Sequence, residues 1–223
     1  MKALIYKEFK LAMHPICYMF VFAFPLMLLI PSFPIGVGFI YILSSYPVLF
    51  LGANKGQQSN DLLFSTLLPV RKKDIVMARI ITVAILQFVY ILMLCALFPL
   101  AFLIHNSIPG DEIPGLGLNA FISVLAIAIV GYSIADLIFF PIYYKHGKSI
   151  VMSTLLTLLG FILYLGIFTI VLAYIPGMEW YKDTLSGELW IQFIVLGVSL
   201  LFYVALHFIV YKVSSKRLEK VDF

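Results

Sequence analysis

The chain has 223 residues, of which 63% are hydrophobic and only 12% are charged, and its net charge is +4. Soluble domains carry about 25% charged residues, so this composition excludes a water-soluble globular protein and indicates an integral membrane protein. The apolar runs last about twenty residues without alternating polarity, which excludes a β-barrel and predicts an all-α polytopic fold. The positive charge fits membrane topology, and we expect no nucleic-acid partner.

Residues 1–14 predict a helix that lies in the membrane interface. At about 100° per residue, Lys7, Lys10 and His14 fall on one narrow strip, and apolar residues occupy the other faces. A basic strip beside a wide apolar face is typical of interfacial helices. The alternative is a frayed, basic flank of the first span. The segment is too charged for a signal peptide, so we expect it to stay uncleaved.

Six transmembrane helices are predicted to follow. The stretch 11–53 has no Asp, Glu, Lys or Arg and is long enough for two spans, with a turn at 31–34 because proline ends helices. Each later apolar run can also cross a hydrocarbon core of about 30 Å. The predicted spans are 15–30, 35–53, 80–104, 117–141, 150–175 and 189–211.

The distribution of basic residues predicts the orientation. With the N-terminus inside, every Lys and Arg except Lys182 lies on the cytosolic side, including those of the tail 212–223. Cytosolic loops of membrane proteins carry this excess of Lys and Arg. We therefore expect a multi-pass protein of a bacterial inner membrane, with both termini in the cytosol.

The segment 60–79 reads NDLLFSTLLPVRKKDIVMAR and contains more than a connecting loop needs. As a helix, 61–68 would present an apolar arc over about two thirds of its wheel, whereas one membrane surface covers about half. Such an arc favours a second apolar contact, with a partner. Pro69 is predicted to end this helix, 71–73 to form a cationic turn, and Asp74 to cap the next helix. The alternative is a solvated basic loop held by lipid headgroups.

The stretch LPVRKKDIVMAR at 68–79 resembles the segment that precedes the third span in small bacterial ABC-2 type permeases, whose form is L-P-V-x-[RK]-x-x-I-V-x-x-[KR]. The predicted topology resembles that family along the whole chain, with an interfacial N-terminal helix, six spans and an outer loop before the last span. Asn60 and Asp61 depart from the family, because many relatives carry a more acidic stretch there.

The resemblance implies an exporter-like fold in which this loop holds a coupling helix that docks in a groove on a cytosolic ABC ATPase. It also implies a dimer, formed with a second copy or a paralogue, and two ATPase subunits that bind ATP and Mg. The residues assigned to ATPase coupling are Asn60, Asp61, Leu62, Leu63, Phe64, Ser65, Thr66, Leu67, Leu68, Pro69, Arg71, Lys72 and Lys73.

We expect no nucleotide site, metal site or catalytic centre in this chain. The triplet 147–149, GKS, imitates the end of a P-loop, but the required first glycine would fall at Ile142 and no strand precedes it. The stretch 185–188, LSGE, is similar to an ABC ATPase signature, but it is predicted to lie outside the cell. ATP hydrolysis is therefore expected in a partner chain.

The spans contain few polar residues, and three of them are candidates for translocation or gating: Gln87, Asp136 and His207. Asp136 is the only acid in a predicted span, and an intramembrane acid is a functional candidate by default. Five residues before Pro141, it is expected about 7–8 Å from the cytosolic end of its helix. It could reach cytosolic water, bond to Ser133, or pair with His207 at similar depth. We favour a structural or gating role over direct substrate contact.

The leading functional hypothesis is an ABC exporter permease for amphipathic peptides or other hydrophobic compounds, because the apolar spans suit a strongly anionic glycan poorly. Among similar permeases without a large outer domain, export of antimicrobial or cytolytic peptides fits best. Two alternatives are the substrate-binding membrane subunit of a vitamin importer, which would not need the loop 60–79, and a stand-alone secondary transporter, which would predict internal repeats.

Overall fold

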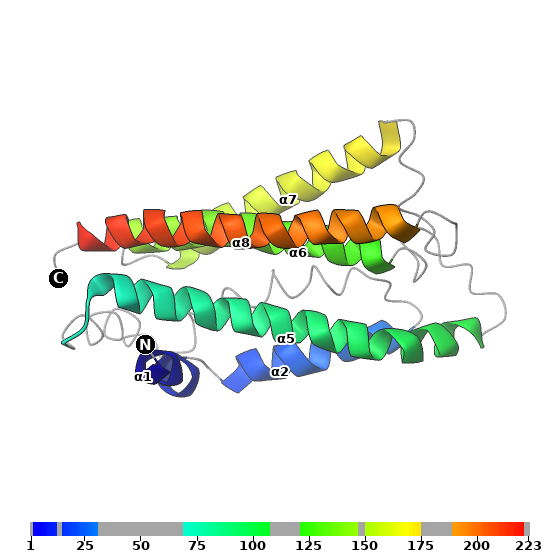
Figure 1. Cartoon of the computed structure of the whole chain (residues 1–223), viewed down its shortest axis with the longest axis horizontal. Coiled ribbons are helices and arrows are strands. Elements are labelled where there is room, and N and C mark those ends of the chain that lie inside the picture. Colours follow the sequence, from blue (N-terminus) through cyan, green and yellow to red (C-terminus); the bar gives the residue numbers. More distant parts are fainter. Residues whose placement is uncertain are drawn as a thin grey trace.

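The computed structural model describes residues 2–12, 15–30, 69–107, 121–146, 150–174 and 189–220, which form a bundle of long helices (Figure 1). No strand occurs among these residues, and the all-α fold is confirmed. The predicted second span at 35–53 and the apolar helix at 61–68 lie outside the described residues, as do the turn at 31–34 and the outer loops at 108–120 and 175–188.

Four helices are long and apolar enough to cross a membrane. They are α5 (Lys72–Asn106), α6 (Phe121–His146), α7 (Ile150–Tyr174) and α8 (Leu189–Glu219). They are preceded by α1 (Lys2–Lys7), the π-helical turn η1 (Glu8–Ala12), α2 (Pro15–Leu26) and the 3-10 turn η2 (Met27–Leu29).

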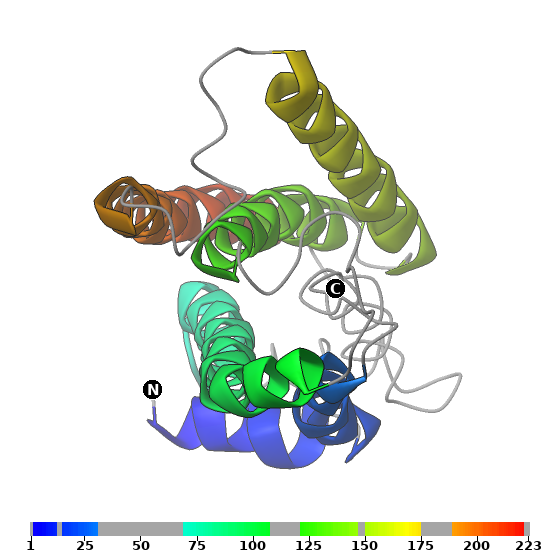
Figure 2. The same cartoon turned by 90° about the vertical axis from the view of Figure 1, so that its right-hand side faces the viewer.

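Helix α6 is the centre of the bundle. It packs against α8 and α7, while α5 packs against α8 and α2. In the most apolar 18-residue segment of α6, 72% of the residues are buried, whereas the corresponding share in α7 is 11%. Gly131 and Ala135, one helical turn apart, are both buried in α6, and small residues at this spacing permit close helix packing in membranes. Helix α7 diverges from α6 and α8 towards its Tyr174 end (Figures 1 and 2).

Three helix ends differ from the sequence-based expectation. Helix α5 begins at Lys72, so Asp74 lies inside its first turn and pairs with Arg71 instead of capping the helix. Helix α6 continues through Pro141 to His146; proline removes one backbone donor, and here this loss does not end the helix. Helix α8 runs on to Glu219, because Ser214, Ser215 and Leu218 are buried beyond the predicted span.

The N-terminal helix lies across the bundle. In Figure 1 α1 is seen end-on while α2 and α5 run across the view, and Figure 2 reverses this relation. The following turn η1 is anchored to α2, because the Tyr18 hydroxyl donates to the Phe9 carbonyl oxygen at 2.6 Å. This orientation is the one expected of an interfacial helix.

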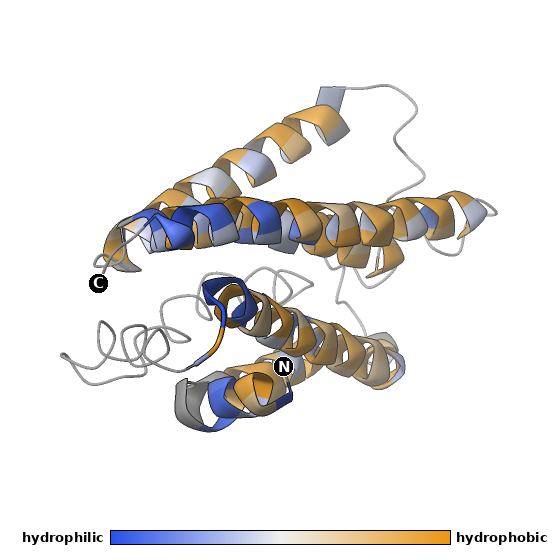
Figure 3. Ribbon diagram, turned by 60° about the vertical axis from the view of Figure 1, so that its left-hand side comes forward, coloured by the Kyte–Doolittle hydropathy of each residue, from blue (hydrophilic) through white to orange (hydrophobic). Residues whose placement is uncertain are grey.

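Hydrophilic residues gather towards one end of the helices (Figure 3). Every described Lys and Arg lies in α1 and η1, at or near the start of α5, or at the ends of α6 and α8. Such an end is the one that the positive-inside rule predicts to face the cytosol. We call it the basic end.

The contact between α6 and α7 provides a test of this packing. A Cβ atom on Gly160 would collide with the Ile138 side chain of α6, whereas one on Gly166 would meet no atom within 4 Å. We expect Gly160→Leu to lower stability by about 1–3 kcal/mol through overpacking. Thermal unfolding in detergent measures the effect, with Gly166→Leu as the control in the same helix. Equal melting temperatures for the two variants would contradict this packing.

Candidate functional site

Four polar side chains from three helices meet in the bundle interior. Gln87 of α5 and Asp136 of α6 are 1% and 0% exposed, and they face Tyr203 and His207 of α8. The Tyr203 hydroxyl donates to Gln87 Oε1 at 2.6 Å, and Gln87 Nε2 donates to Asp136 Oδ2 at 3.0 Å. The sequence analysis had singled out three of these residues and had named His207 as one possible partner of Asp136, and the structure brings all three together.

The four residues form a closed ring of contacts. His207 Nε2 lies 3.0 Å from Asp136 Oδ2, a charge contact without the alignment of a good hydrogen bond. On its other side, His207 Nδ1 lies 2.9 Å from the Tyr203 carbonyl oxygen, and the two rings are 4.0 Å apart between centroids. We call Gln87, Asp136, Tyr203 and His207 the polar ring.

The contacts of His207 determine where its protons can be. The Tyr203 carbonyl can only accept a hydrogen bond, so Nδ1 carries a hydrogen. On the other side, two lone pairs at 3.0 Å would repel each other, so a proton lies on either Nε2 or Asp136 Oδ2. Asp136 and His207 are therefore neutral as a pair in both arrangements, which limits the large cost of burying a charge between apolar helices.

The polar ring lies deeper than the sequence predicted. Asp136 is ten residues from the end of α6 at His146, which is about 15 Å along a helix. The expected 7–8 Å was wrong because α6 does not end at Pro141. The Ser133 hydroxyl does not contact Asp136 but donates to the Ile129 carbonyl of its own helix. Direct access from cytosolic water is not supported, because Asp136 is 0% exposed.

A second buried cluster joins the N-terminal turn to the bundle. Arg79 Nε donates to Glu8 Oε2 at 2.7 Å, and its other guanidinium nitrogen Nη1 donates to the Tyr143 hydroxyl at 3.3 Å. Glu8 and Arg79 are 4% and 7% exposed. This cluster links η1, α5 and α6. Lys7 Nζ lies 3.7 Å from the other carboxylate oxygen, Oε1, so Arg79 makes the shorter of two charge contacts to Glu8. Removing one partner of a buried ion pair leaves a charge that is less well compensated.

Further contacts connect the helices at the basic end. Arg217 of α8 donates to the Pro141 carbonyl oxygen of α6 at 2.6 Å. Lys73 of α5 pairs with Glu219 of α8 at 3.2 Å. Of the residues assigned to ATPase coupling, Lys73 is therefore already engaged within the chain. Arg71 has a side chain that is 88% exposed, and it contacts Asp74 at 3.7 Å. The coupling residues 60–68 lie outside the described residues.

The sequence analysis missed Tyr203, Glu8 and Arg79. Tyr203 precedes His207 by four residues, a spacing that places both on one helix face, but tyrosine is common in these spans. Glu8 is an acid on an otherwise basic N-terminal helix, which was a usable signal for a buried partner. Among the described residues, no group of three His, Cys, Asp or Glu side chains could hold a metal ion.

The bundle of apolar helices with its basic end agrees with the family to which the sequence is similar. A family model described as ABC-2 family transporter protein matches residues 3–217. The chain belongs to this family. It is therefore a multi-pass membrane permease component of an ABC transporter, and the family implies that it works with an ABC ATPase subunit, typically as a dimer. No curated protein and no solved structure matches the chain.

Membership of the ABC-2 family distinguishes between the functional hypotheses as far as the class of transporter. It favours an ABC permease over a vitamin-importer subunit or a stand-alone secondary transporter. It also agrees with the resemblance of the segment 68–79, which falls within the matched residues. The transport component is a generally non-catalytic part of such a system.

The Glu8–Arg79 pair predicts a large loss of stability when one partner is removed. Arg79→Met should destabilise the protein by at most roughly 3–5 kcal/mol, because the buried Glu8 carboxylate then keeps only the longer contact with Lys7 Nζ at 3.7 Å. Combining it with Glu8→Leu should recover much of the loss. Thermal unfolding in detergent measures both variants, with Arg71→Met as an exposed control. A single variant as stable as the control would show that the pair is not buried in the membrane.

The polar ring predicts a functional effect separate from folding. Asp136→Asn preserves the shape of the side chain but removes the carboxylate that faces His207, so transport should fall about tenfold or more while membrane insertion is unchanged. Ser133→Ala, on the same helix, is the control because the Ser133 hydroxyl donates to the Ile129 carbonyl of α6 and lies outside the polar ring. Initial transport rates normalised to inserted protein give the comparison, and unchanged transport would make Asp136 a packing residue.

Proposed function

We propose that this chain is the permease of a bacterial ABC exporter that moves amphipathic peptides or other hydrophobic compounds out of the cell. Both termini lie in the cytosol of an inner-membrane protein. A separate cytosolic ATPase binds ATP and Mg and drives the permease through the coupling segment 60–73. The chain itself holds no nucleotide cofactor, and it works beside a second permease copy or a paralogue.

The observation that carries this proposal is the direct connection between the coupling segment and α5. Helix α5 begins at Lys72, immediately after Pro69, Val70 and Arg71, and it runs to Asn106. Gln87 is fifteen residues from the start of α5, so about 22 Å of uninterrupted helix separates it from Lys72. A helix of this length moves as a rod, because each turn is fixed to the next by backbone hydrogen bonds.

Two buried clusters connect α5 to the neighbouring helices. Near its start, Arg79 ties α5 to η1 and α6 through Glu8 and Tyr143. Deeper in the bundle, Gln87 ties it to α6 and α8 through Asp136 and Tyr203. Displacement of 60–71 by an ATPase therefore shifts these helices together, or else breaks the polar ring. Both outcomes are rigid-element rearrangements of the kind that transporters use.

The chemistry of the spans supports an apolar or amphipathic substrate. Asp136 and His207 are the only Asp, Glu, Lys, Arg or His within 80–104, 121–141, 150–174 and 189–211. The two are paired with each other. Large apolar side chains are exposed along both α7 and α8, including Leu163, Ile167 and Leu201. A strongly anionic polymer would find no counter-charge on these surfaces, whereas a peptide with an apolar face would find contact area.

The coupling segment predicts the behaviour of Phe64, which lies in the centre of its apolar arc. Phe64→Asp should insert normally but lose the ATPase, because a carboxylate cannot enter an apolar groove without a partner. Co-purification of the ATPase encoded beside the gene measures binding, and Phe64→Leu is the matched control. Undiminished binding and transport in Phe64→Asp would exclude 61–68 as the coupling helix.

The direction of transport can be tested with inside-out membrane vesicles, in which the cytosolic face is outside. A fluorescent amphipathic peptide should accumulate in vesicles that contain both subunits when ATP and Mg are added, and it should not accumulate with Phe64→Asp. ATP-driven loss of preloaded peptide from the vesicles would instead indicate an importer.

A further inference from the structure

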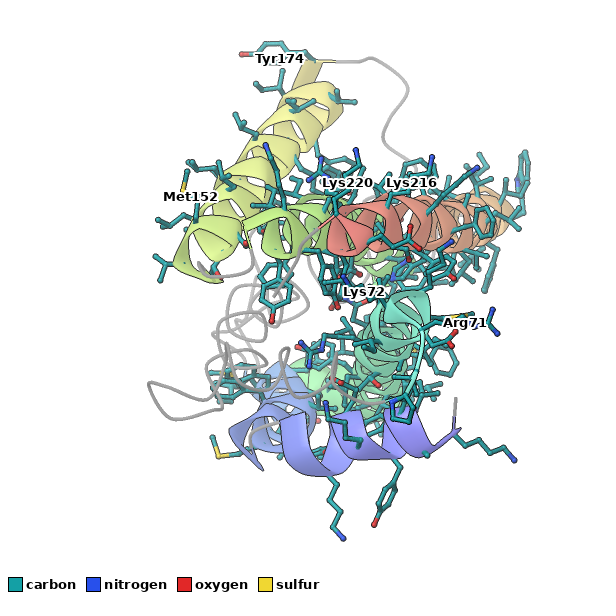
Figure 4. The ribbon with its side chains drawn as sticks, turned by 90° about the vertical axis from the view of Figure 1, so that its left-hand side faces the viewer. Arg71, Lys72, Met152, Tyr174, Lys216 and Lys220 are labelled. Carbon is teal, nitrogen blue, oxygen red and sulfur yellow. The ribbon has the colours of Figure 1, made fainter. Side chains whose placement is uncertain are left out.

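The basic end of α8 borders an open depression of about 530 Å³. Its described lining consists of Val213, Lys216, Arg217, Glu219 and Lys220. Figure 4 places Lys216 and Lys220 on the same side of α8, the side that faces away from α5. This agrees with their spacing of four residues, which brings side chains onto one helix face. The depression lies away from the polar ring and uses none of its residues.

The charges around this depression are not balanced. Glu219 is its only acidic lining residue among those described, and Lys73 of α5 already neutralises it at 3.2 Å. Arg217 is fixed by its contact with the Pro141 carbonyl, which uses one of its five donors and leaves others for a ligand. Lys216 and Lys220 have no ion-pair partner within the described part of the chain. The depression therefore presents net positive charge.

Apolar side chains continue the same face of α8 towards the membrane. At about 100° per residue, Phe202, Ile209 and Val213 fall within about 60° of Lys216 and Lys220. Phe202 and Ile209 are 43% and 46% exposed, so each keeps part of its apolar surface open. The face thus changes from apolar to cationic where α8 reaches the basic end.

We propose that this face of α8 binds an anionic phospholipid, with the headgroup phosphate between Lys216, Lys220 and Arg217 and an acyl chain along Val213, Ile209 and Phe202. The charge complementarity is that of basic pockets at the cytosolic ends of transmembrane helices, which bind anionic headgroups. Glu219 and Lys73 set the strength of the site, because their ion pair prevents the Glu219 carboxylate from repelling the phosphate.

The apolar stripe distinguishes a phospholipid from the two other anionic ligands of similar chemistry. Free phosphate would use only the cations and would gain nothing from Phe202 and Ile209. An acidic surface of the ATPase would meet Lys216 and Lys220 but would not extend to side chains at membrane depth. Only a ligand with a charged head and an apolar tail uses the entire face.

The test measures lipid binding to the purified, full-length permease in neutral detergent by native mass spectrometry. Dioleoylphosphatidylglycerol is compared with zwitterionic dioleoylphosphatidylcholine. We expect the wild type to retain the anionic lipid preferentially. The double variant Lys216→Gln/Lys220→Gln should weaken this binding about thirtyfold, since each lysine near an anionic headgroup is worth about fivefold. Lys145→Gln, at the basic end of α6 but outside the lining, should leave it unchanged.

Glu219→Gln keeps the proposal falsifiable even if the double variant folds poorly. It should raise the affinity for the anionic lipid about fivefold, because it removes the acid and frees Lys73. A misfolded protein would not produce this gain. Lys73→Gln should act in the opposite direction, because it leaves the Glu219 carboxylate beside the phosphate without a counter-charge.

Four outcomes would overturn the proposal. One is equal retention of both lipids by the wild type, and another is equal loss in Lys145→Gln and the double variant. The third is displacement of the lipid by millimolar inorganic phosphate, which would make the site a phosphate site. Loss of ATPase co-purification in the double variant without any change in lipid binding would assign the cations to the ATPase. None of these results depends on transport, so the proposed function is tested separately.

Discussion

The packing of the bundle depends on the polar ring, because a polar group buried among apolar helices requires a partner. A carboxylate between membrane helices must find partners, and Asp136 finds them on two other helices, at Gln87 and His207. Packing alone would let α5, α6 and α8 slide along one another, because their surfaces are similarly apolar. The polar ring fixes their register, since a shift of one residue on any helix would separate the contacting atoms. It therefore defines one resting arrangement of the bundle.

Further polar links join the same helices at the basic end, and α7 takes no part in them. At the basic end, Arg79, Arg217 and Lys73 add cross-links between the same helices and η1. Helix α7 shares none of these ionic links, and it is joined to α6 mainly through apolar packing and the hydrogen bond from the Tyr164 hydroxyl to the Ile127 carbonyl. The described part of the chain thus contains a group of α5, α6 and α8 joined by polar links, with α7 packed against α6 beside it.

Much of this organisation could be predicted from the sequence. Spans are set by run length and hydropathy, so a long apolar helix was expected where α7 lies, and the family was recognisable from the stretch 68–79. Gln87, Asp136 and His207 stood out because polar side chains in apolar runs need a reason. Their joint contact could not be derived, because it depends on how three helices are rotated. Tyr203 gave no signal of its own. The helix end expected at Pro141 was wrong, because the loss of one backbone donor does not end a helix that is packed on both sides.

The length of α5 has a consequence for the membrane around the protein. Its 35 residues extend about 52 Å, and its uncharged stretch 80–104 alone extends about 37 Å, whereas the hydrocarbon core is about 30 Å thick. A helix with surplus apolar length tilts or thickens the bilayer locally. Because Arg79 is held in a buried cluster at one end of that stretch, the surplus apolar length extends towards the other end of α5, where Pro99 lies. Bilayer thickness is therefore mechanically connected to the register of the helices that the polar ring holds together.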